Sequence, residues 1–250
     1  MKIKKMHCVI ALLSIILPKV IMAKNTDEYE VLSKTEKYYK TTMFENELSF
    51  MHKNQLQNYT VEITEDEYVN GVMQNASKSS TSSTIETTYK KLTTTISSNG
   101  TTYRYKAVLN WKNMPKVRSY DIIAIGHYAS VTQNGNVVFS QEYCTSTTNC
   151  TTSTNFTQQK FTNGVSATFK LPTGNYISLK QTLYFDVKKN VDATIIKQLA
   201  AGDYAHATKT ITSNNALKAT VATTGINLNS SISGYYDEIS PATSTWTGNW

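Results

Sequence analysis

Histidine and carboxylate side chains are the first place to look for chemistry in this sequence. Beyond residue 23 the chain has three histidines, His52, His127 and His206, which lie far apart in the sequence. His127 and His206 fall on expected strands, where either could meet Asp121 or Asp203 to form a metal or acid–base site. A histidine packed or hydrogen-bonded inside a sheet is the commoner arrangement. We therefore predict no metal site and no cofactor from these residues.

Paired carboxylates are the second kind of catalytic group to consider, because sugar hydrolysis needs two of them. The acidic residues from which a pair could be drawn are Glu62, Glu65, Asp66, Glu142, Asp237 and Glu238. Their spacing singles out no pair. The sequence also lacks the signatures of zinc proteases, serine hydrolases and phosphate-binding loops. We expect a protein that is not an enzyme, with no catalytic residues; a hydrolase would need a concave site with two close acids.

A short basic loop is the candidate for ligand binding. Lys112, Lys116 and Arg118 surround a Met-Pro pair directly after Trp111. Such a loop can present positive charge and an aromatic surface to an anionic polymer. The alternative, which the sequence favours, is structural: Trp111 belongs to the core, the proline sets a turn, and Arg118 pairs with Asp121.

A Ser/Thr-rich stretch from Ser77 to Tyr105 predicts an amphipathic hairpin with little charge on its Thr/Tyr faces. β-Pore-forming toxins cross membranes with segments of this type, which need about ten residues of alternating polarity per strand. Glu86 and the Lys90-Lys91 pair interrupt any lipid-facing row. A hairpin in water is therefore the favoured interpretation.

The elements that position these residues follow an expected secretory signal peptide. Residues 1–23 have a basic start, an apolar run and a small residue at the end. The run is about ten residues long, whereas a membrane-spanning helix needs about 20. Cleavage would remove four lysines and no acidic residue, which lowers the formal net charge from +7 to +3. A nearly neutral chain is a poor binder of nucleic acid. We predict a secreted protein with no transmembrane segment in the mature chain.

Two cysteines, Cys144 and Cys150, remain after cleavage and enclose five residues. In an oxidising compartment, an even number of cysteines at short spacing predicts one disulfide. Two thiols without a neighbouring histidine or carboxylate are a weaker match to a metal site. Because the closed loop is small, we expect the disulfide to contribute about 2–3 kcal/mol at most.

The strand pattern predicts an all-β fold, mainly an antiparallel β-sandwich. Residues 103–111 alternate as a core-facing row, and residues 120–125 are apolar on both faces, which predicts a central strand covered on both sides. Turn signals recur about every ten to fifteen residues. We expect a signal peptide at 1–23, an arm that is helical or disordered at 24–58, and a single β-sandwich domain at 59–250.

Several local expectations accompany this fold. We predict turns at residues 70–71 and 133–136, a flexible loop at 75–84, a bulge at 89–92, a helix at 192–201, and a last strand that tucks Trp246 into the sheet.

The stretch from Trp111 to Ile125, WKNMPKVRSYDIIAI, resembles one that is shared by uncharacterised exported β-rich proteins of Gram-positive bacteria. The resemblance covers this stretch and, loosely, the strand before it. It implies a bacterial extracellular β-protein and brings no activity, cofactor or catalytic residue with it.

These observations predict a secreted bacterial protein that binds a wall polymer, a glycan or another protein outside the cell or at its surface, without catalysis. The alternative is a β-pore-forming toxin-like protein that inserts the Ser/Thr-rich hairpin. The sequence leaves the identity of the ligand and the oligomeric state open.

Overall fold

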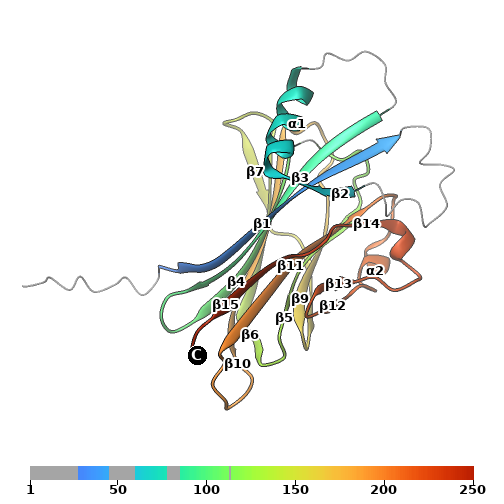
Figure 1. Ribbon diagram of the computed structural model, residues 1–250. Coiled ribbons are helices and arrows are strands. Elements are labelled where there is room, and N and C mark those ends of the chain that lie inside the picture. The colour runs from blue at the N-terminus through green and yellow to red at the C-terminus, as the bar shows by residue number, and fades with distance from the viewer. Residues whose placement is uncertain (1–27, 45–59, 78–84, 113) are drawn as a thin grey trace, which may run out of the picture.

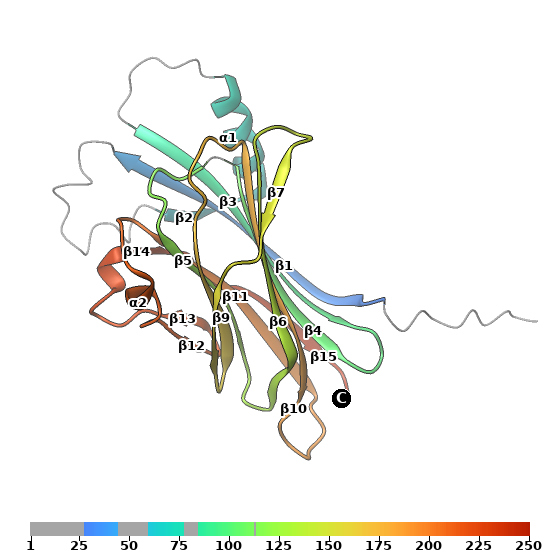
Figure 2. The same ribbon diagram turned by 180° about the vertical axis from the view of Figure 1, so that it is seen from behind.

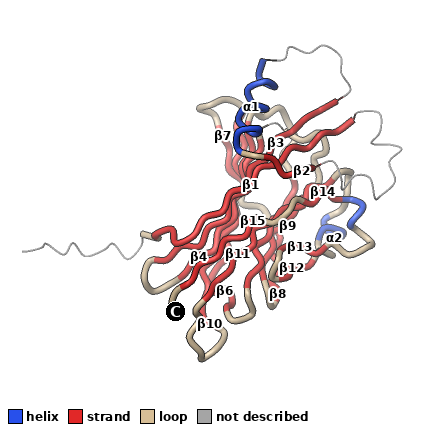
Figure 3. The backbone as a smooth tube through the Cα atoms, in the orientation of Figure 1, coloured by secondary structure: helices blue, strands red, loops and turns tan. Residues whose placement is uncertain are grey.

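Antiparallel strands dominate the computed structural model, which describes residues 28–44, 60–77, 85–112 and 114–250 (Figure 3). One sheet contains β1 (Glu30–Phe44), β2 (Thr60–Ile63), β3 (Ile85–Ser98), β4 (Tyr103–Trp111), β6 (Val131–Cys144), β7 (Cys150–Ser153) and β10 (Ser178–Lys189). The other contains β5 (Tyr120–His127), β8 (Thr157–Phe161), β9 (Gly164–Lys170), β11 (Lys197–Ala207), β14 (Tyr236–Glu238) and β15 (Ala242–Thr247). A small hairpin, β12 (Thr220–Ala222) and β13 (Gly225–Asn227), and the helices α1 (Glu65–Ser77) and α2 (Ser213–Ala216) complete these elements.

The predicted all-β, antiparallel fold is confirmed. The first sheet has the order β2-β1-β3-β4-β10-β6-β7, and the second has the order β14-β11-β5-β9-β8, with β15 also beside β11. Buried side chains from both sheets form one core between them. Figures 1 and 2 show the β12–β13 hairpin and α2 on the side of the second sheet that faces away from the first.

Alternating side chains build this core, as predicted for residues 103–111. In β4 every second residue is buried, and Tyr105 and Leu109 have no exposed surface. The same alternation in β10 places Leu183 opposite Ala107 on the inner face of the first sheet. Because successive side chains of a strand point to opposite faces, one face of each strand enters the core and the other does not.

Strand β5 is buried on both faces, which confirms the prediction for residues 120–125. One face meets the first sheet, and the β12–β13 hairpin packs on the other. Gly126 of β5 and Gly164 of β9 are register partners beneath this hairpin. A Cβ atom on Gly126 would lie 2.3 Å from the carbonyl oxygen of Ala222. Only glycine therefore allows the hairpin to approach so closely.

The N-terminal segment belongs to the first sheet, which corrects the expectation of a helical or disordered arm at residues 24–58. Glu30–Phe44 forms β1 and pairs along its whole length with β3. Tyr38 packs against Tyr68 of α1, while Tyr39 enters the core on the other face. A strand covered on both faces buries consecutive residues, and that pattern resembles a helical one. The rest of the predicted arm lies outside the described residues.

Helix α1 replaces the turn predicted at residues 70–71. The backbone amide of Glu67 donates to Thr64 Oγ1 at 3.2 Å, and the amide of Thr64 donates to Glu67 Oε2 at 2.8 Å. This reciprocal pair is a capping box, which satisfies amides that the first turn leaves without partners. The capping box starts the helix upstream of residues 70–71, so these residues continue the helix and form no turn.

Three further local expectations are corrected. Gly135 has a positive φ of 71° within a register shift of β6, so residues 133–136 form a bulge and not a turn. The bulge expected in β3 lies instead in β1, between Val31 and Ser33. No helix forms at residues 192–196, and β11 begins at Lys197. Most of the loop expected at 75–84 lies outside the described residues.

Two predictions near the ends of the sheets are confirmed. Cys144 and Cys150 are register partners on β6 and β7 and form a disulfide. Trp246 of β15 packs against Tyr103, with ring centroids 5.3 Å apart. The last strand therefore closes the core beside the first sheet.

Candidate functional site

An interruption in the strand beside β11 creates the candidate site. β14 pairs with the end of β11 and β15 pairs with its beginning. Residues 239–241 lie between them, and Pro241 has no amide hydrogen for a ladder bond. The amide of Ile239 donates to the carbonyl oxygen of Tyr204 at 3.2 Å, which keeps the interruption against β11. The edge of the sheet opens at this point.

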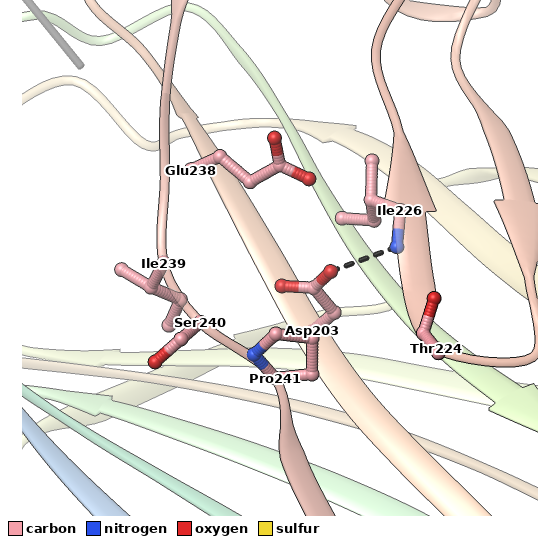
Figure 4. Close-up of a pocket in the computed structure, with 7 residues that line it drawn as sticks. All are labelled: Asp203, Thr224, Ile226, Glu238, Ile239, Ser240 and Pro241. Carbon is pink, nitrogen blue, oxygen red and sulfur yellow. Dashed lines mark hydrogen bonds between the residues drawn. The ribbon is translucent and has the colours of Figure 1, made fainter.

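The opening forms a pocket of about 530 Å³. Its lining, drawn in Figure 4, consists of two carboxyl, two hydroxyl and three apolar side chains: Asp203, Glu238, Thr224, Ser240, Ile226, Ile239 and Pro241. No lysine or arginine is among these lining residues of the described chain. Such a lining suits a ligand group that donates hydrogen bonds and carries an apolar body.

Asp203 is the buried acid of the pocket, with 1% of its surface exposed. Its Oδ2 accepts a hydrogen bond from the amide of Ile226 at 2.7 Å, and its Oδ1 accepts one from the amide of Tyr204 at 2.7 Å. Burial raises the pKa of Asp203 well above its ordinary value, against the opposing effect of these amides. Because both oxygens bind backbone amides, Asp203 anchors β13 onto β11.

Glu238 is the accessible acid of the pocket, and it is half-buried. Burial raises its pKa to about 6. Ser240 Oγ nearby donates to Glu62 Oε2 at 2.7 Å, and Lys37 Nζ lies 2.8 Å from the same oxygen. Ser240 therefore connects the pocket to the ion pair between Lys37 and Glu62. Glu238 is therefore the solvent-accessible acid of the pocket, and it gains or loses its charge near pH 6.

A second hollow, of about 680 Å³, shares Thr224 with the first. Its lining comes from the β8–β9 turn and the β12–β13 turn: Lys160, Phe161, Thr162, Asn163, Val221, Ala222, Thr223 and Thr224. Asn163 Nδ2 donates to Thr223 Oγ1 at 2.6 Å and ties the two turns together. The β12–β13 turn thus contributes a wall to both hollows.

The inner face of the same strands carries a buried polar cluster. Asp121, His206 and Asp237 stand on the adjacent strands β5, β11 and β14. His206 Nδ1 donates to Asp121 Oδ2 at 2.9 Å. From the first sheet, Lys90 Nζ reaches Asp237 Oδ2 at 3.1 Å and lies 4.8 Å from the ring centroid of Trp111. None of these five residues exposes more than 2% of its surface.

The structure confirms that one histidine meets an expected aspartate, because His206 binds Asp121. His127 is elsewhere: its Nδ1 bonds to the carbonyl oxygen of Tyr128, and burial lowers its pKa. His52 lies outside the described residues. No group of three or more histidines, cysteines and acids that could hold a metal ion occurs in the described part of the chain.

The basic loop contributes no exposed aromatic surface. Trp111 is 2% exposed and belongs to the core, which is the structural role that the sequence favoured. Lys112 and Lys116 are exposed. Arg118 donates to the carbonyl oxygens of Pro172 and Gly174 at 3.0 and 2.9 Å. The loop therefore anchors the turn at 172–174, and the aromatic and cationic parts of the predicted ligand site are separated.

The carboxylates considered from the sequence are dispersed. Glu238 lines the pocket, Asp237 lies in the inner cluster, Glu62 pairs with Lys37, Glu65 and Asp66 begin α1, and Glu142 lies 3.8 Å from Lys180. The acid that joins Glu238 in the pocket is Asp203, which the sequence analysis considered only as a partner for a histidine.

Lys90 is the site residue that the sequence analysis missed. In β3 it shares an inward phase with Leu92 and Ile96, both of which are fully buried. Lysine is almost never fully buried unless it is paired. A lysine on the same strand face as buried apolar residues therefore indicated that an acid elsewhere in the chain must pair with it.

Residues 85–98 and 103–105 of the predicted Ser77–Tyr105 hairpin lie inside the first sheet, whereas Ser77 ends α1. The strands β3 and β4 pair with each other, and they also pair with β1 on one side and β10 on the other. In the ranges that the structure describes, no helix combines the length and apolar character needed to cross a membrane.

No family model and no curated protein matches this sequence. The geometry of the pocket and of the inner cluster is therefore the basis for assigning a function.

Proposed function

We propose that this chain is a secreted bacterial protein that works outside the cell or at its surface by binding a ligand, without catalysis, and that the pocket beside Glu238 is the binding site. The supporting observation is an acidic pocket with hydroxyl and apolar walls and one accessible carboxyl. The ligand group that suits it best is a protonated amine, carried by an amino sugar of a wall polymer or by a lysine of a partner protein.

Binding is a better match to the pocket than hydrolysis. A two-carboxylate hydrolase needs both acids free to exchange protons or to attack the substrate. Asp203 has both oxygens bound to backbone amides and almost no exposed surface. Glu238 is then the one carboxyl in the lining that a ligand can reach.

Membrane insertion of the Ser/Thr-rich hairpin is the competing function. Strands β3 and β4 would have to leave their ladders with β1 and β10, and Leu92, Ile96 and Leu109 would leave the core. Burial of each such side chain stabilises the fold by about 1.5–3 kcal/mol. This cost favours a binding function over insertion.

Sedimentation with purified Gram-positive cell walls tests the proposal. We expect the chain to pellet with walls at neutral pH and to stay in solution with walls whose amines have been acetylated. Affinity should fall as the pH drops through the pKa of Glu238, about 6, because the protonated carboxyl no longer attracts an ammonium group.

The matched variants are Glu238→Gln and Glu142→Gln, which remove the same charge inside and outside the pocket. Loss of one charged hydrogen bond should lower the affinity of Glu238→Gln about tenfold or more. Glu142→Gln should bind like the unaltered chain. Equal binding by both variants would refute the pocket as the site. Release of dye from lipid vesicles, together with a detergent-resistant oligomer, would instead support pore formation.

A further inference from the structure

The contact between Lys90 and Asp237 joins the two sheets through the middle of the core. Lys90 Nζ lies 3.1 Å from Asp237 Oδ2, and the two side chains are 0% and 4% exposed. The residues are 147 positions apart in the chain. The pair links β3 of the first sheet to β14 of the second, close to the C-terminal end of the described chain.

The pair is almost completely removed from solvent. An ion pair in a dry interior has lost the hydration of both charges, and mutual attraction repays this loss only with good geometry and further hydrogen bonds. Asp237 Oδ1 is buried and has no hydrogen-bond partner among the described residues. Transfer of one proton from the ammonium group to the carboxylate gives an amine and a carboxylic acid, which are less costly to bury.

We propose that Lys90 and Asp237 condense into an intramolecular isopeptide bond. The lone pair of the neutral Nζ attacks the Asp237 carboxyl carbon, and a tetrahedral intermediate forms. Oδ1 then leaves as water, carrying the proton that the ammonium group has given to the carboxylate and one further hydrogen from the neutral Nζ. The product is an amide with one N–H. Atoms and electrons balance without an oxidant, a reductant or a cofactor.

The neighbouring groups suit this reaction. Thr60 Oγ1 donates to Asp237 Oδ2, which places a hydrogen bond on the oxygen where negative charge develops in the intermediate. The other oxygen, Oδ1, is the one without a partner and is therefore the one free to depart. Lys90 and Asp237 are held by opposite sheets, so their approach needs no further ordering when the bond forms.

His206 is placed to move the proton. It is the register partner of Asp237 on β11, and directly opposite residues have Cβ atoms about 5 Å apart. Its Nδ1 is held by Asp121, while its Nε2 is buried without a partner among the described residues. Nε2 can take a proton from the attacking nitrogen and deliver it to the departing oxygen. Asp121 and His206 act as positioning and relay residues.

The ring of Trp111 shields the pair from water. Its centroid lies 4.8 Å from Lys90 Nζ and 5.2 Å from the His206 ring centroid. Exclusion of water favours the amide over the separate amine and acid, because the departing water cannot easily return. The resulting cross-link would fasten the two sheets covalently, a property that suits a protein working outside the cell.

Intact mass spectrometry of the folded, purified chain tests the proposal directly. We expect a mass lower, by one water molecule, than that calculated for the disulfide-bonded sequence with the observed N-terminus. Protease digestion should release a branched peptide that contains both Lys90 and Asp237. A folded chain at the full calculated mass, with separate peptides for the two residues, would overturn the proposal.

Variants test whether the mass loss comes from Lys90 and Asp237. Lys91→Arg alters the neighbouring lysine, whose side chain is 29% exposed and pairs with Glu36, and it should retain the mass loss. Lys90→Arg and Asp237→Ala should abolish it. In Asp237→Asn the leaving group would be ammonia, so the loss should change to the mass of one ammonia molecule. A water loss that persists in Lys90→Arg would place the modification elsewhere and refute the assignment.

Discussion

Asp237 and Glu238 are consecutive residues of β14, yet they occupy opposite environments. Asp237 points into the core and meets Lys90 at 3.1 Å, with its side chain 4% exposed. Glu238 points away from the core into an open pocket, where burial raises its pKa to about 6. The same division runs along β11, where His206 faces inward and Asp203 faces the pocket.

The comparison shows that neighbouring residues of one strand can have different chemical roles, because their side chains alternate between the two faces of the sheet. Adjacent residues reach opposite faces of a sheet, so one segment can supply a structural cross-link and a binding group at once. What each acid does is then decided by its partner. Asp237 has a buried lysine beside it, whereas Glu238 has solvent and the hydroxyl groups of the pocket.

The largest expected difference is in stability. Asp237→Ala should lower the free energy of unfolding by about 3–5 kcal/mol, because Lys90 would remain buried without its partner. Glu238→Ala should cause a much smaller loss or none, because Glu238 is half-buried and no lysine or arginine is among the described residues that line its pocket. Urea denaturation of both variants measures the contrast. Equal losses would show that the two faces of β14 do not differ in the way their contacts indicate.

Much of the fold could be predicted from the sequence, because alternation in residues 103–111 and the doubly apolar row at 120–125 are local patterns. The first strand could not, since Tyr38 and Tyr39 are buried on opposite faces and the segment therefore lacks the alternation that marks a half-buried strand. The strand becomes recognisable only through its pairing with β3.

The site was harder to predict, because its parts meet through the order of strands and not through their spacing in the sequence. Asp203 and Glu238 are 35 residues apart and come together only where β14 ends beside β11. The Lys90–Asp237 contact depends on how two sheets stack. The basic loop after Trp111 presents no aromatic surface, because Trp111 belongs to the core.

The hairpin that forms a wall of the pocket should be sensitive to Gly126. In Gly126→Ala the new Cβ would fall 2.3 Å from the carbonyl oxygen of Ala222, which is backbone and cannot rotate away. We expect a loss of about 3 kcal/mol in the free energy of unfolding. The amide of Ile226 should also exchange with solvent faster, which hydrogen exchange measures. Retained protection of that amide would mean that the hairpin does not depend on this close approach.

Asp203 should affect the pocket face through its anchoring bonds. Asp203→Ala would leave the buried amides of Ile226 and Tyr204 without their acceptor, at a cost of about 2 kcal/mol. Asp203→Asn keeps one acceptor oxygen and should cost less. Thermal or urea unfolding of both variants gives the order. If the asparagine variant lost more stability than the alanine variant, the anchoring role would be wrong.

The smallest expected effect is the contribution of the Glu238 carboxyl to the pH dependence of the free energy of unfolding. Burial raises the pKa of Glu238 from 4.5 to about 6, so between these values the folded chain binds more protons than the unfolded chain. Stability from this group is therefore present below pH 4.5 and is lost as the pH rises through about 6. The shift corresponds to about 2 kcal/mol at most, and screening by solvent in the open pocket reduces it.

Glu238→Gln should remove this contribution. Asp203, whose pKa is also raised by burial, adds a slope of the same sign, and His127, whose pKa is lowered by burial, adds one of the opposite sign. The informative quantity is therefore the difference between the unaltered chain and the variant, measured by urea unfolding from about pH 4 to pH 7. The unaltered chain should lose stability relative to the variant as the pH rises. A difference that stays constant over this range would show that Glu238 is solvated like an ordinary surface acid, and the contrast with Asp237 would then rest on the lysine alone.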